Sequence, residues 1–337
     1  MSSNTSVPLR IGFLSPHNPF DRRSFSGTAY FAAHALRKNP AIQLKILGTH
    51  RPPGLRNWLL RRTTPKLDEL DPREFDGLDA VISLVASQLI DRFADKCDVP
   101  FIHVTDATPA FLRECYGWNI PPEADAREAR VVQKASAVVY SSNEMAERAK
   151  SEFGIAAARS VPFGINLGAR QRPAKCPGKP PLDRINLLFV GNDWVRKGGD
   201  TAFATLQELR RQGVDAHLTI VGNAPFFLKK VPDVTVVGYL NKNKPDQSAK
   251  LAQLYSEAHF LVLPTTADCS PMVIAEAMAF GTPVLASDTG GVATLVGGAG
   301  TGRTLPVSAT AEDWAQAIMS LVADPFAYEA MSDACFD

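Results

Sequence analysis

Short apolar runs alternate along the chain with amphipathic segments. Each run is six or seven residues long and mostly apolar, which predicts strands that are covered on both faces. The runs are 9–15, 42–48, 80–86, 100–106, 137–142, 185–191, 217–222, 234–240, 259–264 and 283–288. The amphipathic spacing between them predicts helices, which include 28–38, 87–96, 124–135 and 143–153.

Proline and basic residues interrupt this alternation at NLGARQRPAKCPGKPPLDR (166–184), which predicts a linker. Strands alternate with helices on both sides of it, as in parallel sheets covered by helices. We therefore expect an α/β chain with two Rossmann-like doubly wound domains that face each other across a cleft. The expected parts are an N-terminal domain at 1–168, a linker at 169–184 and a C-terminal domain at 185–337. Ligands of such sheets bind beyond the carboxyl ends of the strands.

Composition argues against several classes of protein but does not indicate a particular function. The 337 residues are 45% hydrophobic with a formal net charge of +1, so nothing general favours a nucleic-acid partner. The five cysteines are widely spaced without a CxxC pair, which indicates neither a disulfide framework nor a zinc site. The sequence contains no HExxH or histidine cluster, and no apolar run of membrane-spanning length. We expect a cytoplasmic protein with reduced thiols.

Two carboxylates flank an expected helix start in ADCSPMVIAEAMAFGTPV (267–284). Ser270 is a suitable N-cap and Pro271 suits the first helical position. This pattern places Asp268 in the loop before the helix and Glu276 inside the helix.

The start of that helix is an expected anion site. The first amides, at Met272 and Val273, have no helical partners, and the helix dipole favours negative charge there. A diphosphate at this point would have a carboxylate near each end, and carboxylates accept hydrogen bonds from sugar hydroxyls. The alternative is a capped helix whose Glu276 is merely solvated.

Two further loops follow predicted strands. In FVGNDWVRKGGDTAF (189–203), Arg196 and Lys197 precede two glycines, an arrangement suited to phosphate oxygens. In SPHNPFDRRSFSGTAYFAAHALRK (15–38), Gly27 would let a ligand approach the backbone closely. The alternatives are a solvated basic pair in the first loop and a plain helix cap in the second.

Together these motifs resemble the retaining family-4 glycosyltransferases, which have the GT-B fold. The family signature is an acid, seven residues and a Glu in an EAMAxGxP context, read here from Asp268 to Glu276-Ala-Met-Ala-Phe-Gly-Thr-Pro. The resemblance extends to TIVGNAP, SDTGGVATLV, FSGTAYFAAHAL and VVYSSNEMAERAKSEFGI, and it covers about residues 9–325.

The resemblance implies roles at the matching positions. Lys197, helped by Arg196, would bind the donor diphosphate, Glu276 would hold the ribose hydroxyls, and Asp268 would contact the donor sugar. Gly27 would approach the phosphates from the N-terminal domain. Further donor contacts are implied for the amides of Ser270, Met272 and Val273, and for base contacts near Gly222, Tyr239 and Leu240.

The chain departs from the family pattern at three places. Asp268 stands where Glu is usual, and Asn192 stands where Arg is usual. Many members carry a His-Asp pair at the end of the fourth strand, where this chain has Thr105-Asp106. We expect Asp106 at the acceptor mouth and consider His103 as a second catalytic candidate. The alternative for His103 is a hydrogen-bonded core histidine.

Two other stretches carry possible chemistry. GGAGTGRT (297–304) nearly matches a phosphate-binding GxxxxGK[ST] loop, but Arg303 replaces the lysine, so we expect a surface loop. RPPGLRNWLLRRTTPK (51–66) is basic and apolar without acids, which suits peripheral contact with the inner face of an anionic membrane or with an acceptor. The alternative is a short helix packed on its domain.

With this resemblance, the sequence predicts a metal-independent glycosyltransferase without a cofactor, and the resemblance implies that it is retaining. Its donor would be a UDP-, GDP- or ADP-linked sugar, and its acceptor a glycan, a lipid-linked sugar or a small molecule. The alternatives are a catalytically silent GT-B binding protein and a sugar-nucleotide epimerase on the same fold. The resemblance also implies a final helix that crosses back to the first domain, and we expect this helix to be missing after Asp337.

Overall fold

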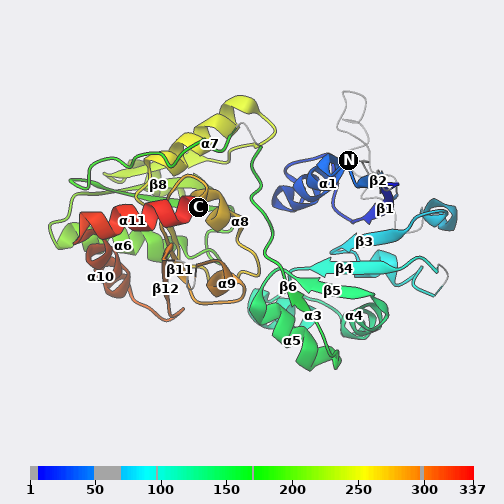
Figure 1. Cartoon of the computed structure of the whole chain (residues 1–337). Coiled ribbons are helices and arrows are strands. Elements are labelled where there is room, and N and C mark those ends of the chain that lie inside the picture. The colour runs from blue at the N-terminus through cyan, green and yellow to red at the C-terminus, as the bar shows by residue number, and fades with distance from the viewer. Residues whose placement is uncertain (1–6, 49–69, 96–97, 169–170, 297–299) are drawn as a thin grey trace. The chain divides into compact units, whose positions relative to one another are not determined.

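The computed structural model describes residues 7–48, 70–95, 98–168, 171–296 and 300–337. The chain divides into two compact units, Met1–Asn166 and Leu167–Asp337. Each unit contains a six-stranded sheet, and every described strand pair is parallel (Figure 1). Each of the ten predicted apolar runs coincides with one of these strands to within a few residues. The predicted α/β class with two doubly wound sheets is therefore confirmed.

The sheet of the N-terminal unit has the strand order β2-β1-β3-β4-β5-β6. Its strands are β1 (Leu9–Leu14), β2 (Ile42–Ile46), β3 (Ala80–Leu84), β4 (Phe101–Thr105), β5 (Ala137–Tyr140) and β6 (Arg159–Ser160). Its α-helices are α1 (Thr28–Lys38), α2 (Ser87–Ile90), α3 (Pro109–Tyr116), α4 (Glu123–Lys134) and α5 (Asn143–Phe153). Two 3-10 turns, η1 (Ser24–Gly27) and η3 (Pro72–Phe75), complete the described elements.

Apolar side chains cover both faces of this sheet because successive residues of a strand point to opposite sides. In β1, Phe13 packs in a cluster with Ala29 and Ala33 of α1. The next residue, Leu14, belongs to a second cluster that includes Val131 of α4. The near-continuous apolar strand in the sequence thus reflects a sheet with helices on each face.

The sheet of the C-terminal unit has the strand order β12-β11-β10-β7-β8-β9. Its strands are β7 (Ile185–Gly191), β8 (Ala216–Gly222), β9 (Val234–Gly238), β10 (Phe260–Leu263), β11 (Val284–Ser287) and β12 (Gly302–Leu305). Its helices are α6 (Gly199–Arg211), α7 (Pro245–Glu257), α8 (Met272–Met278), α9 (Val292–Val296), α10 (Ala311–Val322) and α11 (Pro325–Phe336), with a 3-10 turn η4 (Phe226–Lys230).

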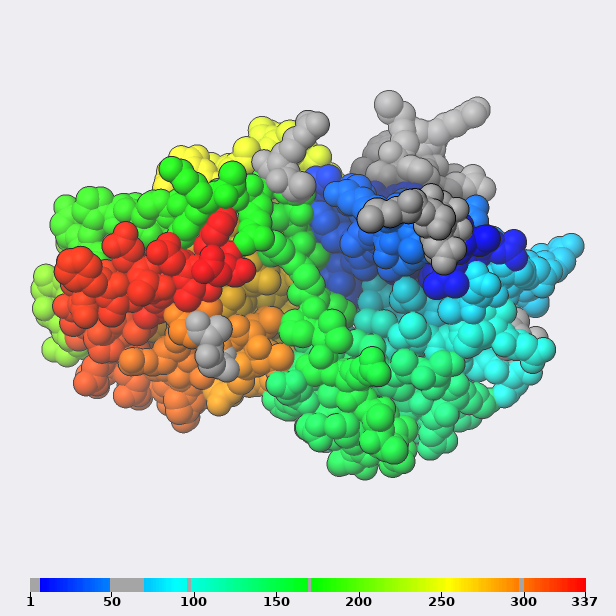
Figure 2. All heavy atoms as spheres, in the orientation of Figure 1, coloured from blue at the N-terminus to red at the C-terminus, as the bar shows by residue number. Residues whose placement is uncertain are grey.

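The last helix, α11, lies on the surface of this unit beside the segment that enters it (Figure 2). The guanidinium of Arg172 lies 4.8 Å from the ring centroid of Phe336 and hydrogen-bonds to the carbonyl of the same residue. Tyr328 of α11 is buried, and its hydroxyl donates to the carbonyl of His259 at 2.9 Å. Thus α11 packs on the unit to which it belongs.

Two local predictions are wrong. The helix predicted at 87–96 is shorter in the structure, where α2 spans Ser87–Ile90 and the turns after it are irregular: the carbonyl of Ile90 accepts from the amide of Phe93 in three-residue spacing and from that of Ala94 in four-residue spacing. The surface loop expected at 297–304 contributes part of β12, an edge strand paired only with β11 in the described sheet. By contrast, α5 matches its predicted range, with Ser142 as its N-cap.

Candidate functional site

The candidate site lies at the carboxyl edge of the C-terminal sheet, between β7 and β10. These strands are neighbours in the sheet although they are far apart in sequence, because the chain order reverses there. Such a reversal is where open α/β sheets bind their ligands, since the loops that follow the two strands diverge. Here these loops are 192–198 and 264–271.

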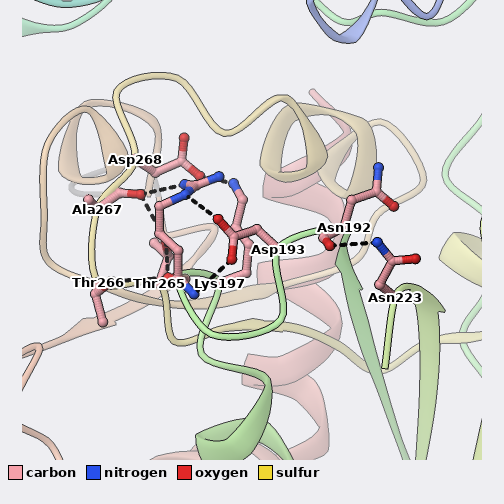
Figure 3. Close-up of polar contacts among 9 residues, drawn as sticks. Asn192, Asp193, Lys197, Asn223, Thr265, Thr266, Ala267 and Asp268 are labelled. Carbon is pink, nitrogen blue, oxygen red and sulfur yellow. Dashed lines mark hydrogen bonds and ion pairs between the residues drawn. The ribbon is translucent and has the colours of Figure 1, made fainter. Parts of the chain in front are cut away.

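Backbone contacts join the two loops directly. The carbonyl of Arg196 accepts hydrogen bonds from the amide of Thr266 at 2.8 Å and from the hydroxyl of Thr265 at 3.1 Å (Figure 3). The guanidinium of Arg196 donates to the carbonyl of Ala267 at 2.8 Å and to Asp193 at 3.1 Å. In this structure, Arg196 thus holds the loop after β7 against the loop after β10.

Glycine at position 198 permits this close approach. Gly198 has a φ of +76°, and a Cβ atom there would lie 1.9 Å from the carbonyl oxygen of Pro264. A side chain would therefore both strain the backbone and separate the two loops. The double glycine that the sequence predicts to be a phosphate loop thus has a clear packing role.

Lys197 and Asp268 form an ion pair across the two loops (Figure 3). Their side chains are 15% and 7% exposed, so most of both groups is withdrawn from water. A pair in such a place is strengthened by the lower dielectric, and removal of either partner leaves a poorly solvated charge. The structure thus brings together two of the residues predicted to bind the donor.

Glu276 is fully buried inside α8, with two polar partners that the sequence did not predict. One carboxylate oxygen forms an ion pair with Lys242, and the other accepts a hydrogen bond from the hydroxyl of Tyr255 at 3.1 Å. Burial, together with the charge of Glu276, raises the pKa of Tyr255 well above its usual range. The phenol is therefore the donor in that hydrogen bond.

A basic residue after a strand end was the signal that could have identified Lys242. It follows β9 by four residues, as Lys197 follows β7 by six. The sequence prediction applied this rule to β7 and expected only base contacts after β9. Tyr255 carries no comparable local signal, because a tyrosine on a helix is an ordinary core residue.

The predicted base-contact residues follow neighbouring strands. Gly222 ends β8 with a φ of +114°, and a Cβ atom there would lie 2.0 Å from the carbonyl oxygen of Gly191. Just beyond, the side-chain amide of Asn223 donates to the backbone carbonyl of Asn192 at 2.9 Å (Figure 3). Tyr239, which is exposed, and half-buried Leu240 follow the end of β9.

The predicted cap of the central helix is wrong. Pro271 occupies the N-cap position with an extended ψ of 93°, and α8 begins at Met272. Ser270 therefore lies outside the helix, because the first helical bond, from the amide of Ile274, goes to the carbonyl of Pro271. Met272 and Val273 remain the first two residues of the helix, as the expected anion site requires.

In the N-terminal unit, Gly27 is the N-cap of α1 and has a φ of +96°. Phe25 and Ser26 before it also have positive φ values, which are uncommon for residues with a side chain. The buried side-chain amide of Asn166 donates to the carbonyl of Ser26 at 2.9 Å and to the hydroxyl of Thr28 at 3.1 Å. These bonds hold the strained loop in place at the start of α1.

The two acceptor-side candidates have different environments. His103 is 1% exposed on β4, with its Nε2 2.9 Å from Glu128 Oε1 and its Nδ1 3.4 Å from Ser83 Oγ. Burial alone would raise the pKa of Glu128, but the neighbouring His103 lowers it below its usual value. These contacts are those of a hydrogen-bonded core histidine. Asp106 follows Thr105 at the carboxyl end of β4 and is half-buried.

Several expectations concern other parts of the chain. The basic segment 51–66 lies outside the described residues. Within the described ranges, no helix is long and apolar enough to cross a membrane. The same ranges hold no group of three or more His, Cys, Asp or Glu side chains placed to bind a metal ion. Metal independence and a membrane contact remain predictions.

Sequence comparisons match the C-terminal unit to a family. Residues 184–324 match the family model described as glycosyl transferases group 1. A D-inositol 3-phosphate glycosyltransferase of Nocardia farcinica is 28% identical over 257 residues, which cover 68% of this chain and 55% of that protein. The chain thus spans about half the length of this relative.

Comparison with solved structures covers nearly the whole chain. Sucrose-phosphate synthase from Thermosynechococcus elongatus has a TM-score of 0.71 at 18% identity, with 97% of this chain and 93% of that chain covered. Anabaena HepE, solved in complex with UDP and glucose, has a TM-score of 0.62 at 13% identity, with 97% and 94% covered. The chain therefore has the GT-B fold, and its C-terminal unit matches the group 1 glycosyl transferases in sequence.

Proposed function

We propose that the protein is a glycosyltransferase whose C-terminal unit binds a nucleoside diphosphate sugar between the loops after β7 and β10. The observation that carries the proposal is the ion pair of Lys197 and Asp268 at this switch point. A lysine held there by a carboxylate is already positioned for a second anion, the donor diphosphate. The match of residues 184–324 to the group 1 family supports this assignment.

In the proposed reaction the bond between the anomeric carbon and the diphosphate breaks, a bond forms between that carbon and the acceptor oxygen, and negative charge develops on the diphosphate. Lys197 would stabilise this charge, together with the first amides of α8 at Met272 and Val273. Asp268 would hold Lys197 and contact a hydroxyl of the donor sugar. Because Lys197 is mostly buried, its charge would act on the leaving group with little screening by water.

The remaining donor contacts of the proposal are those that the family resemblance implies. Glu276 would accept hydrogen bonds from the ribose hydroxyls, and Tyr239 and Leu240 would lie near the base. Arg196 would act mainly by holding the loops together, given its contacts with Ala267 and Asp193. Gly27 would allow the N-terminal unit to approach the donor phosphates.

The acceptor side of the proposal rests on Asp106. Its place after β4 puts it at the carboxyl edge of the N-terminal sheet, where a carboxylate would accept the proton or hydrogen bond of an acceptor hydroxyl. We keep His103 as a positioning residue within the core rather than as a catalytic group, because Glu128 and Ser83 occupy its ring nitrogens. Retention at the anomeric carbon and independence of metal are parts of this proposal.

The acceptor class is proposed more broadly. The relative in Nocardia farcinica is named for D-inositol 3-phosphate, which makes a phosphorylated polyol one acceptor to test. A glycan and a lipid-linked sugar are the other two acceptor classes of the proposal.

A thermal-shift panel with UDP, GDP and ADP and their sugar conjugates tests the donor part. We expect one nucleotide series to raise the melting temperature, with inorganic phosphate as the control. Transfer is then measured as release of the matching nucleoside diphosphate in the presence of each acceptor class. Binding without release for every class would favour a silent binding protein, and no binding to any of the nucleotides would contradict the proposal.

A further inference from the structure

The carboxylate of Glu276 has no exposed surface in this structure, although the proposed ribose contact requires access to it. Both of its oxygens have a partner, Lys242 on one and the hydroxyl of Tyr255 on the other. Because no surface of the carboxylate is exposed, a ribose that binds Glu276 has to displace a group that covers it, and the polar groups in contact with it are these two partners.

The two partners differ in their freedom to move. Tyr255 is fully buried on α7, where its ring stacks on Phe280 with centroids 5.8 Å apart. The side chain of Lys242 is 21% exposed and belongs to the turn between β9 and α7. A lysine has a flexible four-carbon stem and regains hydration when its ammonium turns outward. Lys242 is thus the partner that a ligand arriving from solvent can displace.

The turn that carries Lys242 is held in place by hydrogen bonds that do not involve the Lys242 side chain. The amide of Asn241 donates to the side chain of Gln247 at 2.8 Å, and the amide of Lys244 donates to the carbonyl of Asn241 at 2.9 Å. These bonds fix the turn on the start of α7, so release of Lys242 from Glu276 requires a side-chain rotation and no unfolding of the turn. Displacement then costs one ion pair in a partly buried place.

We propose that Lys242 is a positioning residue that occupies the ribose site in the ligand-free protein and is exchanged for the ribose hydroxyls when the donor binds. This inference rests on the proposed function and extends it to a residue with no assigned role. The exchange lowers donor affinity but keeps the buried carboxylate paired before the donor arrives. It also makes the affinity depend on the ribose, because a ligand that lacks the diol cannot replace the ammonium.

Calorimetric titration with ribonucleoside diphosphates tests the exchange. Wild type, Lys242→Met and Lys242→Arg are titrated with UDP, GDP and ADP and with their 2′-deoxy counterparts. Lys244→Met serves as the matched control. It also removes one lysine charge, at an exposed position two residues after Lys242. Lys242→Arg keeps a positive charge beside Glu276. It therefore tests whether the nucleotide affinity depends on the ion pair or on the lysine side chain as such.

We expect Lys242→Met to bind the preferred ribonucleotide about five- to fiftyfold more tightly, because the apparent affinity of wild type is reduced by the fraction of molecules in which Lys242 occupies the site. Its affinity for the 2′-deoxy counterpart should equal that of wild type, and the Arg and Lys244→Met variants should bind both as wild type does. Equal shifts for the ribo and deoxy forms would indicate general electrostatics and overturn the exchange.

The results distinguish a failure of the proposed exchange from a failure of the proposed function. If wild type binds a nucleoside diphosphate and Lys242→Met binds it equally or more weakly, the exchange is wrong and the donor site stands. If wild type binds none of the six nucleotides, the proposed function fails and the exchange fails with it. A melting curve of Lys242→Met is recorded first, since the unpaired Glu276 should lower its stability without unfolding it.

Discussion

Lys197 and Asp268 form an ion pair although 71 positions separate them in sequence. The second acid of the same motif, Glu276, is likewise paired with a lysine, Lys242, from another loop. In this structure, both carboxylates of the acid-x7-Glu block are thus neutralised by lysines that follow sheet strands. Under the proposed function, donor binding would exchange the pair of Lys242 and Glu276 for ribose contacts and would keep Lys197 beside Asp268.

Replacement of Lys197 by Met should reduce turnover roughly ten- to thousandfold, the usual effect of losing one charged donor to a developing anion. Met keeps the apolar stem, which matters because the Cβ and Cγ of Lys197 pack close to Gly191. The measurement is steady-state release of nucleoside diphosphate. Lys250→Met, at an exposed position on α7, is the matched control and should retain full turnover. Unchanged kinetics in Lys197→Met would refute its role in catalysis.

Replacement of Glu276 by Gln should weaken the binding of a nucleoside diphosphate by about an order of magnitude, because an amide offers one acceptor oxygen where a carboxylate offers two. Gln keeps the shape and the helix propensity of Glu, so α8 should persist. Calorimetry gives the affinity, and circular dichroism checks the helix. Equal affinity in the two proteins would mean that Glu276 is structural.

Gly198→Ala should lower the stability of the C-terminal unit and abolish nucleotide binding, because its Cβ would collide with Pro264 at the junction of the two loops. Gly213→Ala is the matched control, since Gly213 has a similar φ of +83° but its Cβ would meet no atom within 4 Å. The control should lose only about 1–2 kcal/mol for the positive φ. Denaturant unfolding measures the free energy of unfolding of both variants. An equal decrease in the two would show that the loops can separate at no cost.

The stability of the protein should fall as the pH drops below about 6.5, partly through His259. Its Nδ1 accepts from the amide of Asn186 at 2.8 Å and its Nε2 lies 2.9 Å from the carbonyl of Pro180, so the neutral ring satisfies both neighbours. Burial lowers the pKa of His259 below its usual 6.5. Between the lowered pKa and 6.5 the unfolded chain binds a proton that the folded chain does not, so the free energy of unfolding decreases with acidity.

His259→Asn is the variant that isolates this contribution. Its side-chain oxygen can accept from the amide of Asn186 without titrating in this range. The free energy of unfolding, measured by urea denaturation between about pH 5 and pH 8, should fall less steeply in the variant than in wild type. A variant with the same slope as wild type would assign the pH dependence to other groups, such as His217, whose pKa burial also lowers.

Much of the fold was predictable because buried parallel strands are marked by continuous apolar runs. Each run coincides with one strand, and the strand ends placed Lys197 and Asp268 at one edge of a sheet, whereas Gly222 was singled out through the family resemblance. The local signal failed at the start of α8. Ser270 is a good N-cap by residue type, yet Pro271 has an extended ψ and occupies the cap position, so the helix starts one residue later than expected.

The pairings within the site could not be predicted from local sequence. Lys242, Tyr255 and Glu276 lie on three different elements, and their contact depends on how α7, α8 and the turn after β9 pack together. The periodicity of apolar residues predicts which face of a helix is buried. It does not predict which buried acidic side chain forms an ion pair with which basic side chain. The same limit applies to His103, whose core role depends on Glu128 of another element.

Hydrogen–deuterium exchange, with and without the nucleoside diphosphate that stabilises the protein most, tests the proposed donor site most directly. A diphosphate bound between the loops after β7 and β10 should concentrate protection in residues 192–199 and 264–276. Lys197→Met should lose that protection while the exchange of the remaining core strands stays unchanged. Protection confined to other segments, or equal protection in Lys197→Met, would contradict the assignment of the donor site.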